Sequence, residues 1–482
     1  MNSVRRSLAY TIGESYLANV LQVISIFFLA RWLTPAETGV WAIASVFAAI
    51  ASNFRDFGVA EYLIQEKDLT NEKLRAALAV NIVASWLMAV CLLLASSAIG
   101  EFYREPGVSS VMRIQACNFL LIPFGAVTYA YFRRNLDYRP FFWASVLSNI
   151  ATFTISLSLA WNGFGYMSLA WSSLAGVLVT VVVAIVARPT ELPRWPSFKG
   201  WRDVLHSGKH LTGIYVFGQI GKSAPELIIG RTLGVAPVGF FSRANGLGEL
   251  FNRTVLRAAL PVCLPYFAQE VRKGQDIRDG YLKAVSYLTA IGWPAFLFLS
   301  AMAYPTVRIL YGSQWIASVP LAQILCIVAA VEVTYYLAKE VLIAQGDAHH
   351  ANYLQVVSQV ARIAGLLAAI PFGLIGACWG LLAAAVVGAV FSHKILYERI
   401  GLNLSQLFRT CKPSFMITLI STAPSFLWVA FGRVDEYNFV LVMAAASLSF
   451  GLAWFCSLKY FRHPLWQEIR NLCLRACGKH SV

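Results

Sequence analysis

The chain has 482 residues, of which 58% are hydrophobic and 13% are charged, whereas about 25% of the residues in an average soluble protein are charged. This composition excludes a secreted, disordered or cytosolic protein. The formal net charge of +15 at pH 7 could indicate nucleic acid as a partner. The positions of the basic residues along the chain decide whether it does. We therefore expect a polytopic membrane protein.

Apolar runs of about 20 residues, the length that crosses a bilayer, recur from one end of the chain to the other. The first run is too long for the apolar region of a signal peptide, so we expect it to remain as a span. The eighth and tenth runs are interrupted by charges and are the least regular. The fourteen predicted spans are 9–30, 39–57, 76–99, 111–132, 141–161, 166–187, 209–230, 239–264, 284–304, 319–341, 352–370, 374–392, 414–431 and 437–458.

Lys and Arg gather in every second loop between these runs. Of the 39 basic residues, 27 lie on the side of the two termini and 6 on the opposite side. By the positive-inside rule this bias places both termini in the cytoplasm. Most of the positive charge is thereby explained as a marker of orientation, and we expect no nucleic acid as a partner.

Residues 30–39 are repeated in part 200 residues later, at 230–239, with Arg, Leu, Ala and Gly at matching places. Both copies join one long run to the next on the outer face, and an even number of runs separates them. A parallel repeat of this kind is typical of transporters built from two related lobes. We expect an all-α protein with a six-helix lobe in 1–200, a second in 201–400, and two additional helices with a basic cytoplasmic tail in 401–482.

Charged and polar residues within the runs of the second lobe fall on narrow helical faces. Each charge costs about 2.5–3.5 kcal/mol in the centre of a bilayer, so such residues usually face protein or a wet pathway. The cationic candidates for substrate binding are Lys222, Arg243, Arg253, Arg257 and Arg362. The polar and coupling candidates are Gln219, Glu226, Glu249, Glu332, Lys339, Gln355 and Gln359.

Arg is planar, remains charged and binds phosphate through two parallel hydrogen bonds, so this set favours an anionic headgroup as cargo. The alternative is that some charges only form structural pairs, such as Lys222 with Glu226 or Glu249 with Arg253, each four residues apart on one helix. No catalytic, metal or cofactor site is expected. His206 and His210 share a helical face, but we interpret them as a juxtamembrane turn.

The segment 30–39 (ARWLTPAETG), with 56–60 (DFGVA), 63–70 (LIQEKDLT) and 344–347 (AQGD), resembles bacterial polysaccharide transporters. These are the Wzx-like flippases of the multidrug/oligosaccharidyl-lipid/polysaccharide superfamily. The resemblance implies that undecaprenyl-pyrophosphate-linked oligosaccharide is moved by alternating access across the bacterial inner membrane, for exopolysaccharide or lipopolysaccharide O-antigen synthesis. It also implies the bilayer, a polysaccharide polymerase and export machinery as partners. It leaves coupling to a Na⁺ or H⁺ gradient open.

In the related flippases, cationic cavity residues lie on the seventh, eighth and eleventh spans. The matching positions here are Lys222, Arg253, Arg257 and Arg362, while the alignment of Arg243 stays open. Two other functions remain as alternatives. A multidrug antiporter of the same superfamily would favour an acidic cavity, and a membrane glycan polymerase or ligase would need acid–base groups in a sizeable outer loop.

Overall fold

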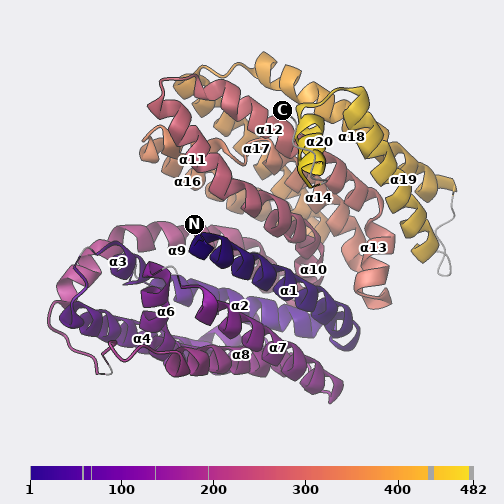
Figure 1. The fold of residues 1–482 in the computed structure, drawn as a ribbon. Helices are drawn as coiled ribbons and strands as arrows, with labels where there is room; N and C mark the ends of the chain where they lie inside the picture. The colour runs from indigo at the N-terminus through magenta and orange to yellow at the C-terminus, as the bar shows by residue number, and fades with distance from the viewer. Residues whose placement is uncertain are drawn as a thin grey trace. The chain divides into compact units, whose positions relative to one another are not determined.

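The computed structural model describes residues 2–56, 59–66, 68–135, 137–193, 195–431 and 439–476. The chain is 88% helical, and no β-strand occurs in those ranges. The predicted all-α class is confirmed. Contacts divide the chain into two compact units, Met1–Gly239 and Phe240–Val482, drawn in Figure 1 from indigo to yellow.

In the first unit α7 packs on α8 and α1, and α4 packs on α5 (Figure 1). Its core includes a cluster around Leu63, Ala77 and Val127. The helices are α1 (Asn2–Trp32), α2 (Pro35–Asp56), α3 (Val59–Gln65), α4 (Asn71–Tyr103), α5 (Pro106–Leu121), α6 (Pro123–Arg134), α7 (Arg139–Trp161), α8 (Met167–Val186) and α9 (Trp201–Thr232).

The turn between α1 and α2 shows how the conspicuous motif at 34–37 acts locally. The backbone N–H of Thr34 donates to Glu37 Oε2 (2.8 Å), and the N–H of Glu37 donates to Thr34 Oγ1 (3.2 Å). This is a capping box, and Pro35 occupies the first helical position, where its missing N–H costs nothing. The motif therefore fixes the start of α2.

The second unit has a large core around Phe267, Tyr281 and Phe296. Its α16 and α17 pack as a hairpin, and α18 packs on both α12 and α19. Its helical segments are α10 (Val235–Phe251, which begins in the first unit), the π-helix η1 (Asn252–Leu256), α11 (Arg257–Arg272), α12 (Ile277–Ala301), α13 (Ala303–Leu310), the 3₁₀ helix η2 (Ser313–Ser318), α14 (Val319–Val333), α15 (Ala338–Ala344), α16 (Ala348–Ala369), the 3₁₀ helix η3 (Ile370–Phe372), α17 (Gly373–Ile400), α18 (Leu404–Phe431), α19 (Phe439–Tyr460) and α20 (Pro464–Ala476).

Each of the fourteen predicted runs overlaps one or more of these helices. The eighth run is split by the π-helix η1, and the tenth is broken between α14 and α15, at the two places where charges interrupt the hydropathy pattern. The fourth run is also irregular, because α5 and α6 meet at an angle of 53° before Pro123. Proline lacks the N–H that would continue the helix.

By length and composition, eight helices within the described ranges are apolar enough to cross a membrane, or nine if the bent pair α5–α6 counts as one span. A multi-pass membrane protein follows from this number. The expectation of fourteen crossings remains a prediction.

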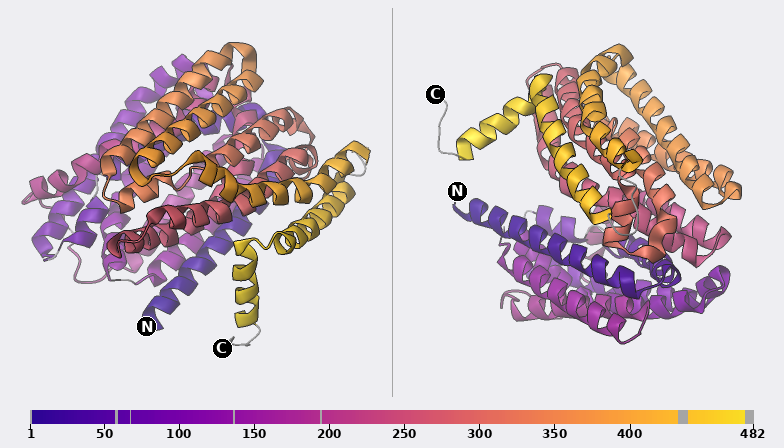
Figure 2. Two further views of the ribbon diagram at one scale, coloured as in Figure 1. Left: turned by 90° about the horizontal axis from the view of Figure 1, so that it is seen from above. Right: turned by 90° about the vertical axis from the view of Figure 1, so that its right-hand side faces the viewer.

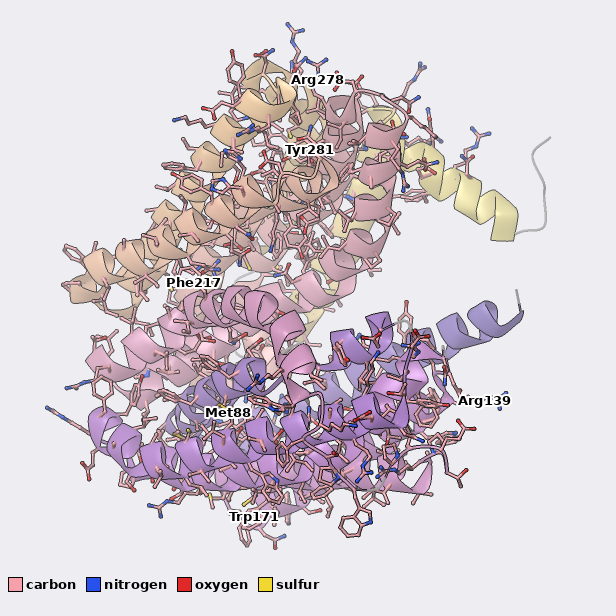
Figure 3. All side chains as sticks on the ribbon, turned by 90° about the vertical axis from the view of Figure 1, so that its left-hand side faces the viewer. Met88, Arg139, Trp171, Phe217, Arg278 and Tyr281 are labelled. Carbon is pink, nitrogen blue, oxygen red and sulfur yellow. The ribbon has the colours of Figure 1, made fainter. Side chains whose placement is uncertain are left out.

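The helix α4 buries several polar side chains and exposes large apolar ones on another face. Ser85 and Ser96 are fully buried, whereas Leu87 and Leu94 are 55% and 77% exposed. A water-soluble helix has the opposite arrangement, and an extended exposed apolar face is suited to lipid. Trp171 of α8 also lies on an outer face of the first unit (Figure 3).

The unit boundary follows Gly239, so α9 packs with the first unit. The predicted division at residues 200 and 400 stays a prediction. At the other end of the chain, α20 turns sharply away from α19 (Figure 2). Its residues Leu465, Trp466 and Ile469 pack in one cluster with Leu458, Ala290 of α12 and Ile417 of α18.

Candidate functional site

Arg362 and Glu332 form an ion pair inside the second unit. Arg362 Nη2 on α16 lies 2.6 Å from Glu332 Oε1 at the end of α14, and both side chains are about 30% exposed. A charge-assisted hydrogen bond of this length is short and strong. The sequence shows no acidic neighbour for Arg362 on its own helix, and the structure supplies one from α14.

A second polar contact follows the same face of α16. Lys339 Nζ on α15 donates to Gln355 Oε1 at 3.1 Å. One turn further along, Gln359 Oε1 is buried, with no hydrogen-bond partner among the described residues. Because Gln355, Gln359 and Arg362 recur at helical spacing, they form one polar strip against α14 and α15. The structure thus brings five of the predicted residues together.

The predicted cations Arg253 and Arg257 lie where the helix geometry changes. Arg253 is in the π-helix η1, and Arg257 begins α11. Their side chains lie outside the described residues. Just before them, Asn252 Nδ2 donates to Glu249 Oε2 at 3.4 Å. Single π-helical turns inside α-helices frequently occur at functional sites.

Arg243 lies in an aromatic environment at the other end of α14. Its guanidinium carbon is 5.2 Å from the ring centroid of Trp315 and 5.6 Å from that of Tyr311. The Tyr311 hydroxyl donates to the Arg243 carbonyl at 3.3 Å. The 15 residues of α14 separate this position from Glu332 by roughly 20 Å. The structure does not bring Arg243 to the Arg362–Glu332 pair, and its aromatic contacts are of the cation–π type.

The remaining candidates lie on α9, in the first unit. Gln219 Nε2 donates to Ser223 Oγ at 2.9 Å, so these two residues satisfy one another on one helical face. Lys222 is exposed, and Glu226 is half-buried one turn later. Pro225 lies within the helix between them.

The arginine and lysine candidates are suited to binding an anion. Arginine and lysine side chains on helices that break or change pitch can hold an anion in an otherwise apolar protein. No group of three or more His, Cys, Asp or Glu side chains that could hold a metal occurs in the part of the chain that the structure describes.

Two polar clusters have no counterpart in the sequence-based candidates. At the start of α16, Asp347 Oδ1 is 2.8 Å from His350 Nδ1, and Arg399 Nε is 3.3 Å from Asp347 Oδ2. The second cluster surrounds the buried His463, whose Nε2 is 2.9 Å from Ser286 Oγ. Among these residues, only Asp347 has a structural role that the sequence predicts, because Asp is a favoured N-cap residue directly before a helix.

Comparisons with known proteins agree with the sequence resemblance. A family model described as polysaccharide biosynthesis protein matches residues 28–320. The teichuronic acid biosynthesis protein TuaB of Bacillus subtilis (strain 168) is 24% identical over 463 residues, which cover 92% of this chain and 93% of TuaB. The lipopolysaccharide biosynthesis protein WzxC of Escherichia coli (strain K12) is 22% identical over 466 residues, 95% of this chain and 93% of WzxC.

A solved structure is similar over nearly the whole fold. The lipid II flippase MurJ, in an inward closed conformation, aligns with a TM-score of 0.74 at 13% identity. The alignment covers 94% of this chain and 99% of that one. The alignment therefore includes helices of both compact units, and at 13% identity it shows a similar fold.

Proposed function

Because this chain belongs to the polysaccharide biosynthesis protein family, we propose that it is a flippase that moves lipid-linked oligosaccharide repeat units across the bacterial inner membrane. The family match over residues 28–320 carries the proposal and confirms the predicted resemblance to polysaccharide transporters. The names of similar proteins support it, since TuaB is a teichuronic acid biosynthesis protein, WzxC a lipopolysaccharide biosynthesis protein and MurJ a lipid II flippase. The cargo is then an undecaprenyl-pyrophosphate-linked unit for exopolysaccharide or O-antigen.

The pyrophosphate is the part of this cargo that the cationic candidates would recognise. Arg253 and Arg257, one helical turn apart, would bind phosphate oxygens through paired N–H donors. Lys222 is a separate cationic candidate, on α9 of the first unit. Arg362 is already paired with Glu332, so the carboxylate would hold its guanidinium in a fixed orientation rather than leave it to contribute a full free charge.

Alternating access would follow from the proposed repeat of two six-helix lobes. One contact supports this repeat. A Cβ atom on Gly39 would overlap the carbonyl oxygen of Val235, and one on Gly239 would overlap that of Pro35. Reciprocal contacts of this kind arise when two equivalent segments meet about a two-fold axis. The fourteen spans, the cytoplasmic termini and coupling to a Na⁺ or H⁺ gradient belong to the same proposal.

Substitution of Arg253 or Arg257 by Ala tests the cationic site. We expect at least about a tenfold loss of surface polysaccharide, because one lost charged hydrogen bond costs about 1.5–3 kcal/mol, with the amount of protein in the membrane unchanged. Lys at either position should restore export in part, since it keeps the charge but not the paired donors. Arg272→Ala, at the exposed end of α11, is the matched control. Normal export with both positions neutral would contradict the proposal.

Lipid extraction after gene deletion separates the remaining alternatives. A flippase predicts that complete lipid-linked repeat units accumulate on the cytoplasmic face. A glycan polymerase, ligase or transferase predicts instead that incomplete or unjoined glycans accumulate, and a multidrug antiporter predicts no change in these lipids.

A further inference from the structure

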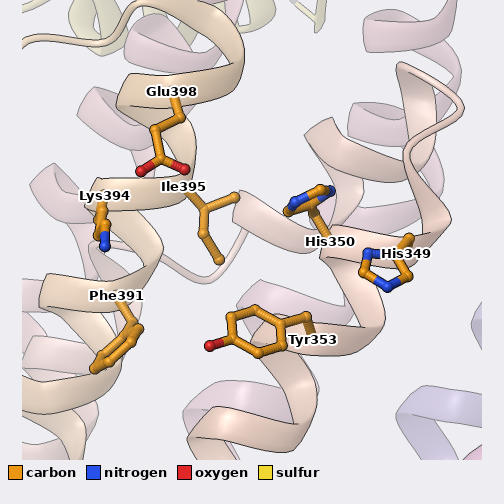
Figure 4. A pocket seen from close by; sticks show the side chains of 7 residues that line it. All are labelled: His349, His350, Tyr353, Phe391, Lys394, Ile395 and Glu398. Carbon is orange, nitrogen blue, oxygen red and sulfur yellow. The ribbon is translucent and has the colours of Figure 1, made fainter.

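A pocket of about 230 Å³ lies between the first turns of α16 and the last turns of α17 (Figure 4). It belongs entirely to the second unit and is separate from the polar strip of Gln355, Gln359 and Arg362, which lies on another face of α16. Its lining residues are His349, His350, Tyr353, Phe391, Lys394, Ile395 and Glu398.

One wall of the pocket is held in place by charged neighbours. His350 Nδ1 is 2.8 Å from Asp347 Oδ1, and Arg399 Nη2 is 2.7 Å from His350 Nε2. Arg399 Nε also contacts Asp347 Oδ2 at 3.3 Å. These contacts join the start of α16 to the end of α17. These contacts therefore hold the His350 ring in place as part of the pocket wall, and both of its ring nitrogens already have polar partners.

The opposite wall carries one positive and one negative side chain. Lys394 and Glu398 lie one turn apart on α17, and both are exposed. Lys394 precedes Glu398, which is the weaker of the two i, i+4 orders for an ion pair, and none joins them among the described residues. His349, exposed on the α16 side, adds further N–H donor capacity. The pocket thus presents separate binding positions for an anion and for a cation.

Exposed apolar stripes lead from this pocket along both helices. On α16 the stripe comprises Tyr353, Val356 and Val360, the last of which is 54% exposed. On α17 it comprises Val386 and Val390, the latter 62% exposed. At 100° per residue the α16 members fall within about 60°, on the same face as His349. In a membrane protein such stripes face acyl chains, and the pocket lies where a lipid headgroup would begin.

We propose that this pocket binds the headgroup of phosphatidylethanolamine, with the acyl chains of the lipid along the two apolar stripes. Lys394 and His349 donate to the phosphate, and Glu398 accepts hydrogen bonds from the primary ammonium group. The volume of about 230 Å³ is below the roughly 300–1,000 Å³ of pockets for drug-sized ligands, so the pocket would hold a headgroup and leave the acyl chains outside.

The charge pattern selects this lipid over two common alternatives. A phosphatidylglycerol headgroup has no cation for Glu398, and its net negative charge would lie beside that carboxylate. A phosphatidylcholine headgroup has a cation, but its three methyl groups leave no N–H donor for Glu398. The pocket therefore distinguishes lipids by a hydrogen bond as well as by charge.

Native mass spectrometry of the purified, delipidated full-length chain tests the proposal. The protein is titrated separately with dioleoyl phosphatidylethanolamine, phosphatidylglycerol and phosphatidylcholine. We expect the first to bind at least about fivefold more tightly than the other two. Glu398→Gln should abolish this preference, because it removes the charged acceptor of the ammonium N–H groups, whereas Lys394→Gln should weaken all three lipids, because each has a phosphate.

Lys459→Gln and Glu468→Gln make the same chemical changes at exposed positions away from the pocket, so they serve as matched controls. Both should bind the three lipids as the unaltered protein does. Equal binding of all three lipids by the unaltered protein, or tighter binding of phosphatidylglycerol, would overturn the proposal. So would a preference for phosphatidylethanolamine that survives Glu398→Gln. Since the variants alter exposed side chains, their elution in size-exclusion chromatography should match that of the unaltered protein.

Discussion

His463 shows how a single buried side chain joins several helices. Its ring is 1% exposed and lies in the turn between α19 and α20. The N–H of Leu465 donates to its Nδ1 at 3.2 Å, while Nε2 lies 2.9 Å from Ser286 Oγ and 3.4 Å from Ser414 Oγ. A neutral ring that accepts at Nδ1 carries its proton at Nε2 and can donate it to either serine. The histidine thus connects α20 to α12 and α18.

Burial lowers the pKa of His463 to about 4. Between about pH 6.5 and pH 4 the unfolded ring binds a proton that the folded ring does not, so the free energy of unfolding falls as the pH falls through this window. The full effect is roughly 3 kcal/mol. The thermal midpoint in detergent should therefore fall between pH 7.5 and pH 4.5, and His463→Gln should show a shallower fall. Parallel curves for the two proteins would contradict this, and His349→Gln, at an exposed site, should keep the original slope.

The candidate site could be predicted from the sequence only in part, and the reason lies in single contacts. Charge inside an apolar run marks Arg362 and Glu332 as unusual, but the 30 residues between them hide their pairing. His463 has no unusual sequence environment, because its serine partners lie 177 and 49 residues away. The hydropathy pattern thus identifies polar residues within apolar spans. Their hydrogen-bond and ion-pair partners depend on tertiary packing, which the pattern does not contain.

At the scale of elements, the hairpin of α16 and α17 depends on two glycines. A Cβ atom on Gly365 would overlap the carbonyl oxygen of Gly380, and one on Gly380 would overlap that of Gly365. Small residues allow helix backbones to approach this closely in membranes, where packing rather than the hydrophobic effect drives association. This hairpin also forms the lipid pocket proposed above.

Gly380→Ala should therefore destabilise the protein by about 1–3 kcal/mol, the usual cost of overpacking. Gly451→Ala provides the matched control. It lies inside α19 with open space around it, so alanine should be neutral there or gain up to about 1 kcal/mol in helix propensity. The thermal midpoints of the two variants in the same detergent measure the difference. Equal midpoints would show that α16 and α17 can separate without cost.

The positions of helices were more predictable than their irregularities. Apolar runs located the long helices because burial in lipid requires about 20 apolar residues in sequence. Charges also marked the runs that are split at η1 and between α14 and α15. The 53° bend before Pro123 has a visible signal in the proline itself, although the apolar pattern predicts 111–132 as one span. The π-helical form of η1 depends on neighbouring packing, which hydropathy does not contain.

At the scale of the whole molecule, the contact between residues 35–39 and 235–239 relates local packing to the proposed two-lobed design. All of these residues belong to the first compact unit, and α10 continues from there into the second. Gly39 approaches the carbonyl oxygen of Val235, and Gly239 approaches that of Pro35. Adding 200 to the residue numbers in the first segment gives the equivalent residues in the second, so the two contacts are the same contact made in both directions. An approximate two-fold axis produces such an exchange, whereas an accidental contact has no reason to be reciprocal.

Gly39→Ala and Gly239→Ala should consequently have equal effects. Each methyl group would force apart the same pair of helix starts at a cost of about 1–3 kcal/mol, a 5- to 150-fold shift against this packing. Either variant should reduce surface polysaccharide, and the double variant should lose less than the sum of the two, because the contact is already open. Gly248→Ala, on α10 with only an ordinary contact to Ala329, should export normally. A large effect from only one of the two glycines would show that the segments are not equivalent, because a symmetric contact must respond to a change on either side.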